Sequence, residues 1–201
     1  MKNLTLTLLV ALFSHFLLAQ KTILSGEYSS ELKLAYDGKA KMVTGYFESY
    51  IGWDERTNNP RFSCIFYLEG KITESKNKIN TYYPGEKTED LIEGVLEISE
   101  DTTVSLKLPN EHGGCWNVQH FADEPVKFIF ENGFNWLQIR YVTATKTYFY
   151  SEKSNDRKLK SYLIKGNIVC IEKIEEEWAY CSYFGKKVTK GWLKITDLNI
   201  L

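Results

Sequence analysis

The segment YSSELKLAYDGKAKMVTGYFESY, residues 28–50, decides the fold class of this chain. Apolar and polar residues alternate over residues 28–36 and again over residues 42–50, which is the period of a half-buried β-strand. Asp37-Gly38 separates the two runs, and Asp-Gly in that position is a strong signal for a tight hairpin. The segment therefore predicts two antiparallel strands.

Runs of the same kind recur up to residue 142, and no window shows a sustained helical period. We expect further strands over residues 62–68, 78–83, 91–98, 104–108, 126–130 and 136–142, the last two paired across Asn132-Gly133. Residues 52–61, GWDERTNNPR, look like a long exposed loop. Such regular spacing predicts an all-β fold in which residues 22–142 form an antiparallel meander or small barrel of about eight strands.

The N-terminus predicts export. Lys2 precedes a mostly apolar run over residues 4–18, and Ala19 offers a small residue for cleavage, as in a secretory signal peptide. Ser14 and His15 interrupt the run, which is too short for a membrane anchor. We therefore expect residues 1–19 to be a signal peptide and the product to be secreted or periplasmic, soluble and without a membrane span.

Charge divides the rest of the chain into two parts. Residues 20–142 carry 13 Lys/Arg against 19 Asp/Glu, a net charge of −6, whereas residues 143–201 carry 11 against 7, a net charge of +4. The contrast predicts two units with different surfaces, an acidic β domain over residues 22–142 and a second domain over residues 143–201. The basic excess is too small to indicate a nucleic-acid partner.

The second unit carries an ordered series of turn and aromatic signals. A strand over residues 146–150 opens the unit. A polar loop follows over residues 151–160, and then a Lys-Gly turn at Lys165-Gly166. An acidic turn before a Trp lies at residues 175–178, and a Gly-Lys turn lies at Gly185-Lys186. The unit closes with the pairs Gly191-Trp192 and Asp197-Leu198.

In this order residues 143–201 resemble the bacterial SH3-like (SH3b-type) domain, whereas residues 22–142 resemble no family that we recognise. The resemblance implies a small barrel in an exported bacterial protein. Such domains often bind peptidoglycan or other cell-wall material, or act as spacers. The family often has an Asn-x-Arg triplet in the opening strand, where this chain has Tyr148-Phe149-Tyr150, so ligand chemistry centred on that Arg is not carried over.

Aromatic side chains of this unit are the candidate ligand-binding residues, because aromatic faces suit sugars and extended peptides. Tyr148 and Tyr150 share one strand face. Small barrels also bury one or two Trp, so the alternative for Trp178 and Trp192 is a place in the core. The candidates are Tyr148, Tyr150, Trp178, Tyr183 and Trp192.

The four cysteines are even in number and follow the predicted signal peptide, which favours disulfides. We expect Cys64–Cys115 and Cys170–Cys181, since each pair stays within one unit. Cys170 and Cys181 flank the turn at Glu175, but their strand faces need not match, and two unpaired thiols are the alternative.

The motif HGGCWNVQH, residues 112–120, allows three interpretations. His112, Cys115 and His120, with Cys64, could hold a metal, although an odd spacing in a strand would place Cys115 and His120 on opposite sides. Cys115 could be a nucleophile with a nearby His as base, although no helix begins at Cys115. We favour the third interpretation, a Cys64–Cys115 disulfide.

These patterns predict a function in binding. No phosphate loop, serine elbow or zinc-protease helix is present, and two His remain after the predicted cleavage. We expect a non-enzymatic binding protein of the cell envelope, without cofactor or metal, whose partner is peptidoglycan or an envelope protein. The alternatives are an inhibitor or immunity protein against a basic wall-degrading enzyme, and a hydrolase built on Cys115 or a metal.

Overall fold

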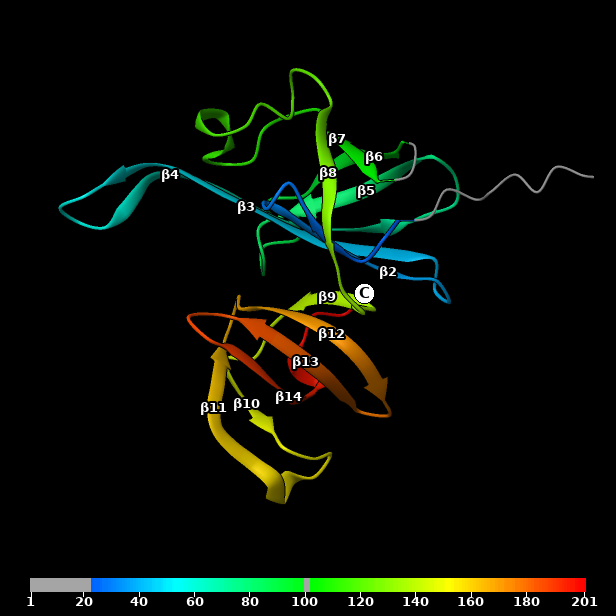
Figure 1. Ribbon diagram of the computed structural model, residues 1–201, viewed down its shortest axis with the longest axis vertical. Helices are drawn as coiled ribbons and strands as arrows, with labels where there is room; N and C mark the ends of the chain where they lie inside the picture. Colours follow the sequence, from blue (N-terminus) through cyan, green and yellow to red (C-terminus); the bar gives the residue numbers. More distant parts are fainter. Residues whose placement is uncertain (1–22, 100–101) are drawn as a thin grey trace, which may run out of the picture.

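The computed structural model describes residues 23–99 and 102–201 and confirms the all-β class (Figure 1). The predicted signal peptide, residues 1–19, lies outside the described residues. Eight strands form a closed barrel, and six more form a second sheet that lies against it. No helix within the described ranges is long and apolar enough to cross a membrane.

The barrel is an antiparallel meander, as the alternating runs predicted. Each strand pairs with the next in the chain, and the eighth pairs with the first to close the barrel. Asp37 Oδ1 accepts hydrogen bonds from the amides of Lys39 and Ala40, which fixes the predicted first turn. The strands are β1 (Gly26–Tyr28), β2 (Leu32–Asp37), β3 (Met42–Asp54), β4 (Asn59–Lys71), β5 (Lys76–Tyr82), β6 (Ile92–Ile98), β7 (Thr103–Lys107) and β8 (Val126–Gly133).

Phenylalanine rings fill the barrel interior. Phe47 stacks on Phe66 with 5.1 Å between ring centroids and meets Phe121 and Phe128 edge-on at 5.0 and 5.8 Å. Gly45 lies on β3 beside this core, where an added Cβ would stand 2.6 Å from a Leu34 methyl carbon. Dense packing of buried side chains in the interior stabilises the barrel.

The second sheet has the strand order β11-β10-β14-β13-β12-β9. It begins with β9 at Gln138, before residue 143, where the second domain was expected to begin. Its strands are β9 (Gln138–Tyr141), β10 (Lys146–Tyr150), β11 (Lys158–Ile164), β12 (Ile168–Glu175), β13 (Trp178–Phe184) and β14 (Val188–Lys194). Short 3-10 turns lie at η2 (Cys115–Asn117), η3 (Asn155–Arg157) and η4 (Ile195–Asp197).

The predicted hairpin between residues 126–130 and 136–142 is wrong. β8 pairs with β7 and with β1, whereas β9 pairs with β12 in the other sheet. Barrel closure satisfies both edges of β8, so β9 must find its partner elsewhere. Asn132-Gly133 therefore ends a barrel strand and does not form a hairpin turn.

The predicted loop over residues 52–61 is also wrong. β3 continues to Asp54 and β4 begins at Asn59, with Trp53 paired to Pro60, so only four residues form the turn. The two strands extend beyond the barrel as a narrow ribbon, which Figure 1 shows in cyan. We call residues 50–63 the β3–β4 arm. Its Trp53 side chain is 60% exposed.

The two units share a buried contact formed by the outer barrel wall and β9. Tyr67 Oη donates to the Ile139 carbonyl oxygen at 2.9 Å, and the Ile139 amide donates to Thr44 Oγ1 at 2.7 Å. Tyr67, Tyr82 and Tyr141 pack together there, with ring centroids 5.3 to 6.2 Å apart. The contact agrees with a chain that has no Gly/Ser/Pro linker between its two units.

One of the two expected disulfides forms. Cys64 on β4 is bonded to Cys115 in η2, whereas Cys170 and Cys181 are free and buried. Cys181 lies opposite Ile171 in the β12–β13 ladder, one register position away from Cys170. Because side chains alternate along a strand, Cys181 points into the core of the second unit and Cys170 points toward the barrel.

Candidate functional site

Five aromatic side chains lie on the outer surface of the second sheet, which we call the aromatic face. They come from β11, β10, β14 and β13, and the strand register places them in two groups that are two residues apart along β10. Tyr162 pairs with Tyr148, and Tyr150 pairs with Trp192, which in turn pairs with Tyr180. The alternate residues of the same strands, such as Phe149 and Leu193, point into the core. The aromatic face thus consists of Tyr162, Tyr148, Tyr150, Trp192 and Tyr180.

The rings of the aromatic face contact one another and a buried Trp. The ring centroids of Tyr148 and Tyr162 are 6.0 Å apart, and those of Tyr180 and Trp192 are 5.3 Å apart. Tyr150 meets Trp178 edge-on at 5.0 Å. Trp178 is 4% exposed, so it supports Tyr150 and offers little surface of its own. These contacts hold the rings in place, which lowers the entropy cost of binding a ligand.

Three lysines border the aromatic face and give it a positive rim. Lys153 also forms an ion pair with Glu175, which raises the pKa of Lys153 and lowers that of Glu175. Ammonium groups above ring faces are held by the ring quadrupole. The distances from Nζ to ring centroid are 3.9 Å for Lys146 and Tyr162, 5.0 Å for Lys146 and Tyr148, 4.7 Å for Lys158 and Tyr148, and 5.7 Å for Lys153 and Trp192.

The structure brings together three of the five residues predicted to bind a ligand. Tyr148, Tyr150 and Trp192 lie on the aromatic face. Trp178 shares the strand face of Tyr180 but is buried, with Tyr150 edge-on against its ring and Lys194 Nζ 5.7 Å from its ring centroid. Tyr183 lies elsewhere, because it packs against the core of the second unit and lines a cavity of about 220 Å³ beside the barrel.

Sequence reasoning missed Tyr162, Tyr180 and the lysines. Tyr180 lies two positions from Trp178 and therefore shares its strand face, so alternation would have found it. Tyr162 needed the register of β11 against β10, which pairs it with Tyr148. That register could not be read from the residues alone.

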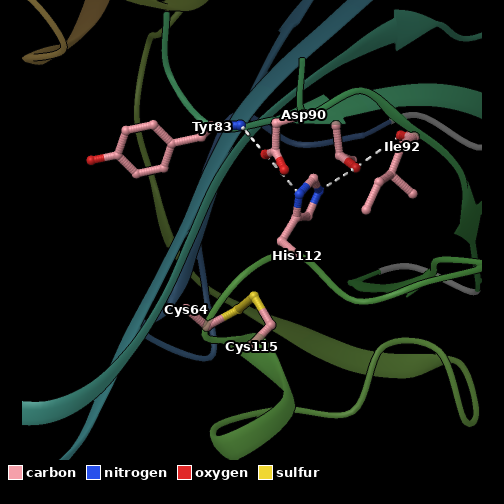
Figure 2. Close-up of polar contacts among 7 residues, drawn as sticks. Cys64, Tyr83, Asp90, Ile92, His112 and Cys115 are labelled. Atoms are coloured by element: carbon pink, nitrogen blue, oxygen red, sulfur yellow. Dashed lines mark hydrogen bonds and ion pairs between the residues drawn. A yellow bond between two sulfur atoms is a disulfide. The ribbon is translucent and has the colours of Figure 1, made fainter. Parts of the chain in front are cut away.

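Apart from the aromatic face, a cluster of hydrogen-bonded polar side chains lies at one end of the barrel (Figure 2). His112 Nδ1 is 2.9 Å from Asp90 Oδ2, and His112 Nε2 is 2.8 Å from Thr81 Oγ1. Thr81 Oγ1 is also 2.9 Å from the Ile92 carbonyl oxygen, so its single hydrogen serves one of these two partners at a time. The Tyr83 amide donates to the same Asp90 oxygen at 2.7 Å.

This cluster has the Thr-His-Asp order of a catalytic relay, but its Thr and His side chains are shielded from solvent. Thr81 is fully buried, His112 is 3% exposed, and the His112 ring stacks on Phe66 of the barrel core. Burial lowers the pKa of His112, although Asp90 opposes the shift, and a lowered pKa favours the neutral ring. The cluster ties two loops to the barrel end.

The structure shows a different arrangement from the one that the metal and thiol interpretations of residues 112–120 require. The disulfide uses both Cys64 and Cys115, and His112 is directed at Thr81 and Asp90. His120 packs edge-on against Trp116 at 5.0 Å. Across residues 23–99 and 102–201, no three His, Cys, Asp or Glu side chains converge as metal ligands would.

Comparison of the chain with family models, with curated proteins and with solved structures finds no match. The geometry of the aromatic face therefore carries the functional inference.

Proposed function

We propose that this chain is an exported, non-enzymatic binding protein of the cell envelope that holds a wall polymer such as peptidoglycan on its aromatic face. The proposal includes a bacterial SH3-like character for the second unit. The five aromatic rings on one sheet face, bordered by lysines, are the observation that supports it most. The order of turn signals in residues 143–201 adds support, because Lys165-Gly166 and Gly185-Lys186 fall between strands.

The chemistry of the face fits a polymer of sugars and short peptides. Sugar rings and extended peptides stack on aromatic faces, while the ammonium groups of Lys146 and Lys158 pair with carboxylates. Neighbouring strands lie about 4.8 Å apart, so four strands extend over about 14 Å, room for several units of an extended chain.

Retention on purified peptidoglycan tests the proposal. We expect the chain from Gln20 onward to sediment with the insoluble polymer and to be released as salt rises, because lysine–carboxylate pairs at a surface are screened. Lys146→Met is expected to weaken retention about two- to fivefold. Lys78→Met, an exposed lysine on the barrel, is the matched control and leaves retention unchanged. Absence of wild-type retention would sink the proposal.

A second candidate function, inhibition of a basic wall-degrading enzyme, is favoured by the β3–β4 arm. The arm extends from an acidic barrel and carries Tyr50, Ile51 and Trp53, which are 40%, 39% and 60% exposed. A two-stranded ribbon with exposed aromatic residues suits insertion into a cleft, and negative charge speeds the encounter with a basic protein.

Turbidity assays with hen egg-white lysozyme and wall suspensions test this second candidate. If it is right, a stoichiometric amount of the protein stops lysis and Trp53→Ala restores it, whereas Trp192→Ala does not. Lysis at an unchanged rate with excess wild-type protein contradicts it. The two tryptophan variants thus separate the two functions, since Trp53 and Trp192 belong to different units.

A further inference from the structure

A cavity lies between the barrel and the second sheet, away from the aromatic face. Its volume is about 220 Å³. Pockets for drug-sized ligands measure about 300–1,000 Å³, so this cavity fits a smaller molecule. We call it the junction cavity. Lys33, Tyr46 and Glu48 line it from the barrel, and Cys170, Tyr183 and Phe184 line it from the second sheet.

The junction cavity contains an ammonium group with few partners. The Lys33 side chain is only 17% exposed, and its Nζ lies 3.9 Å from Glu48 Oε1, which is longer than a hydrogen bond. No described residue accepts a shorter bond from Lys33 Nζ. A mostly buried ammonium with one distant partner retains hydrogen-bonding capacity for an acceptor within the cavity.

The carboxylate opposite Lys33 is only half satisfied. Glu48 Oε2 accepts hydrogen bonds from the hydroxyls of Tyr46 and Tyr50, each at 3.2 Å. Burial, followed by Glu48, raises the pKa of Tyr50 to about 12 and that of Tyr46 further, so both hydroxyls stay protonated and donate. Glu48 Oε1 is left facing Lys33, which places one positive and one negative group side by side in the cavity.

We infer that the junction cavity binds an α-amino acid as a zwitterion. The ligand carboxylate pairs with Lys33 Nζ and its ammonium group with Glu48 Oε1, so that two ion pairs lie head to tail. The ligand side chain packs against Phe184 and Ile168, which requires it to be apolar. Asn167 adds a donor, because its Oδ1 accepts from the Ile164 amide and its Nδ2 remains available. The site goes beyond the proposed wall-binding function.

Isothermal titration of the full chain with leucine tests this inference. Saturable binding of L- or D-leucine at millimolar or lower concentration is expected. N-acetylleucine lacks the ammonium charge and leucine amide lacks the carboxylate, so each should bind at least about tenfold more weakly. Failure of both enantiomers to bind, or equal binding of leucine and its two blocked derivatives, overturns the inference.

Three variants locate the site. Lys33→Met and Glu48→Gln are each expected to weaken leucine binding at least about tenfold, because each removes one ion pair. Lys78→Met, on the exposed barrel surface, should bind leucine as the wild type does. Thermal melting of each variant shows that it is folded, and Glu48→Gln keeps the side-chain shape. Undiminished leucine binding by both cavity variants would place the ligand elsewhere.

Discussion

Replacing Cys64 and Cys115 together by Ala is expected to lower the free energy of unfolding by about 4 kcal/mol. The two cysteines are 51 residues apart, and a bond that closes a loop of this length restricts the unfolded chain strongly. The bond also anchors η2 to β4, next to the segment that places His112 at the barrel end. Chemical denaturation of the oxidised wild type and the double variant measures the difference.

Cys181→Ala is the control for this first prediction. Cys181 is as fully buried as Cys64, but it is free, so its loss removes packing and no cross-link. We expect it to cost about 1 kcal/mol. Equal losses of stability in the double variant and in Cys181→Ala would show that the cross-link contributes nothing to stability.

His112→Gln is expected to lower the free energy of unfolding by about 1–3 kcal/mol near neutral pH and to remove a pH dependence. The variant loses the stacking on Phe66 and disturbs the bonds to Asp90 and Thr81. Burial lowers the pKa of His112 in the folded protein below its ordinary value of 6.5. The unfolded chain therefore binds the proton more readily than the folded protein does. The contribution of the neutral His112 ring to the free energy of unfolding is full above pH 6.5 and falls as the pH drops below that value.

Melting temperatures between about pH 8 and about pH 5 measure this effect. The wild type should lose stability more steeply than His112→Gln as the pH falls. Gln119→Ala, which removes no titratable group from the same loop, should keep the wild-type slope. Parallel slopes for the wild type and His112→Gln would show that the buried ring does not remain neutral in the folded state.

Signals within a short segment predicted the structure of that segment, but the pairing of strands that are distant in sequence could not be predicted. Asp37-Gly38 marks its turn because the signal and the strands that it joins are adjacent. The partner of β9 is set by closure of the barrel between β8 and β1, which no residue near β9 records. The Gly, Asn and Pro of residues 52–61 indicated a loop, yet pairing between β3 and β4 overrides these preferences.

The candidate site shows the same limit. Tyr148 and Tyr150 were found because alternation places them on one face, and Cys64–Cys115 was found because both residues belong to one unit. Trp178 and Trp192 look alike in the sequence, but Trp178 is buried, whereas Trp192 is partly exposed. The lysines over the rings escaped notice, since their positions depend on the bulge at β10–β11 and on the path of residues 151–157.

Binding of purified peptidoglycan by the chain from Gln20 onward, compared between Trp192→Ala and Trp53→Ala, decides whether the aromatic face holds the polymer. Both variants remove an indole, one from the aromatic face and one from the β3–β4 arm. We expect Trp192→Ala to weaken binding by about tenfold or more and Trp53→Ala to bind as the wild type does. Equal affinities for Trp192→Ala and the wild type would contradict it.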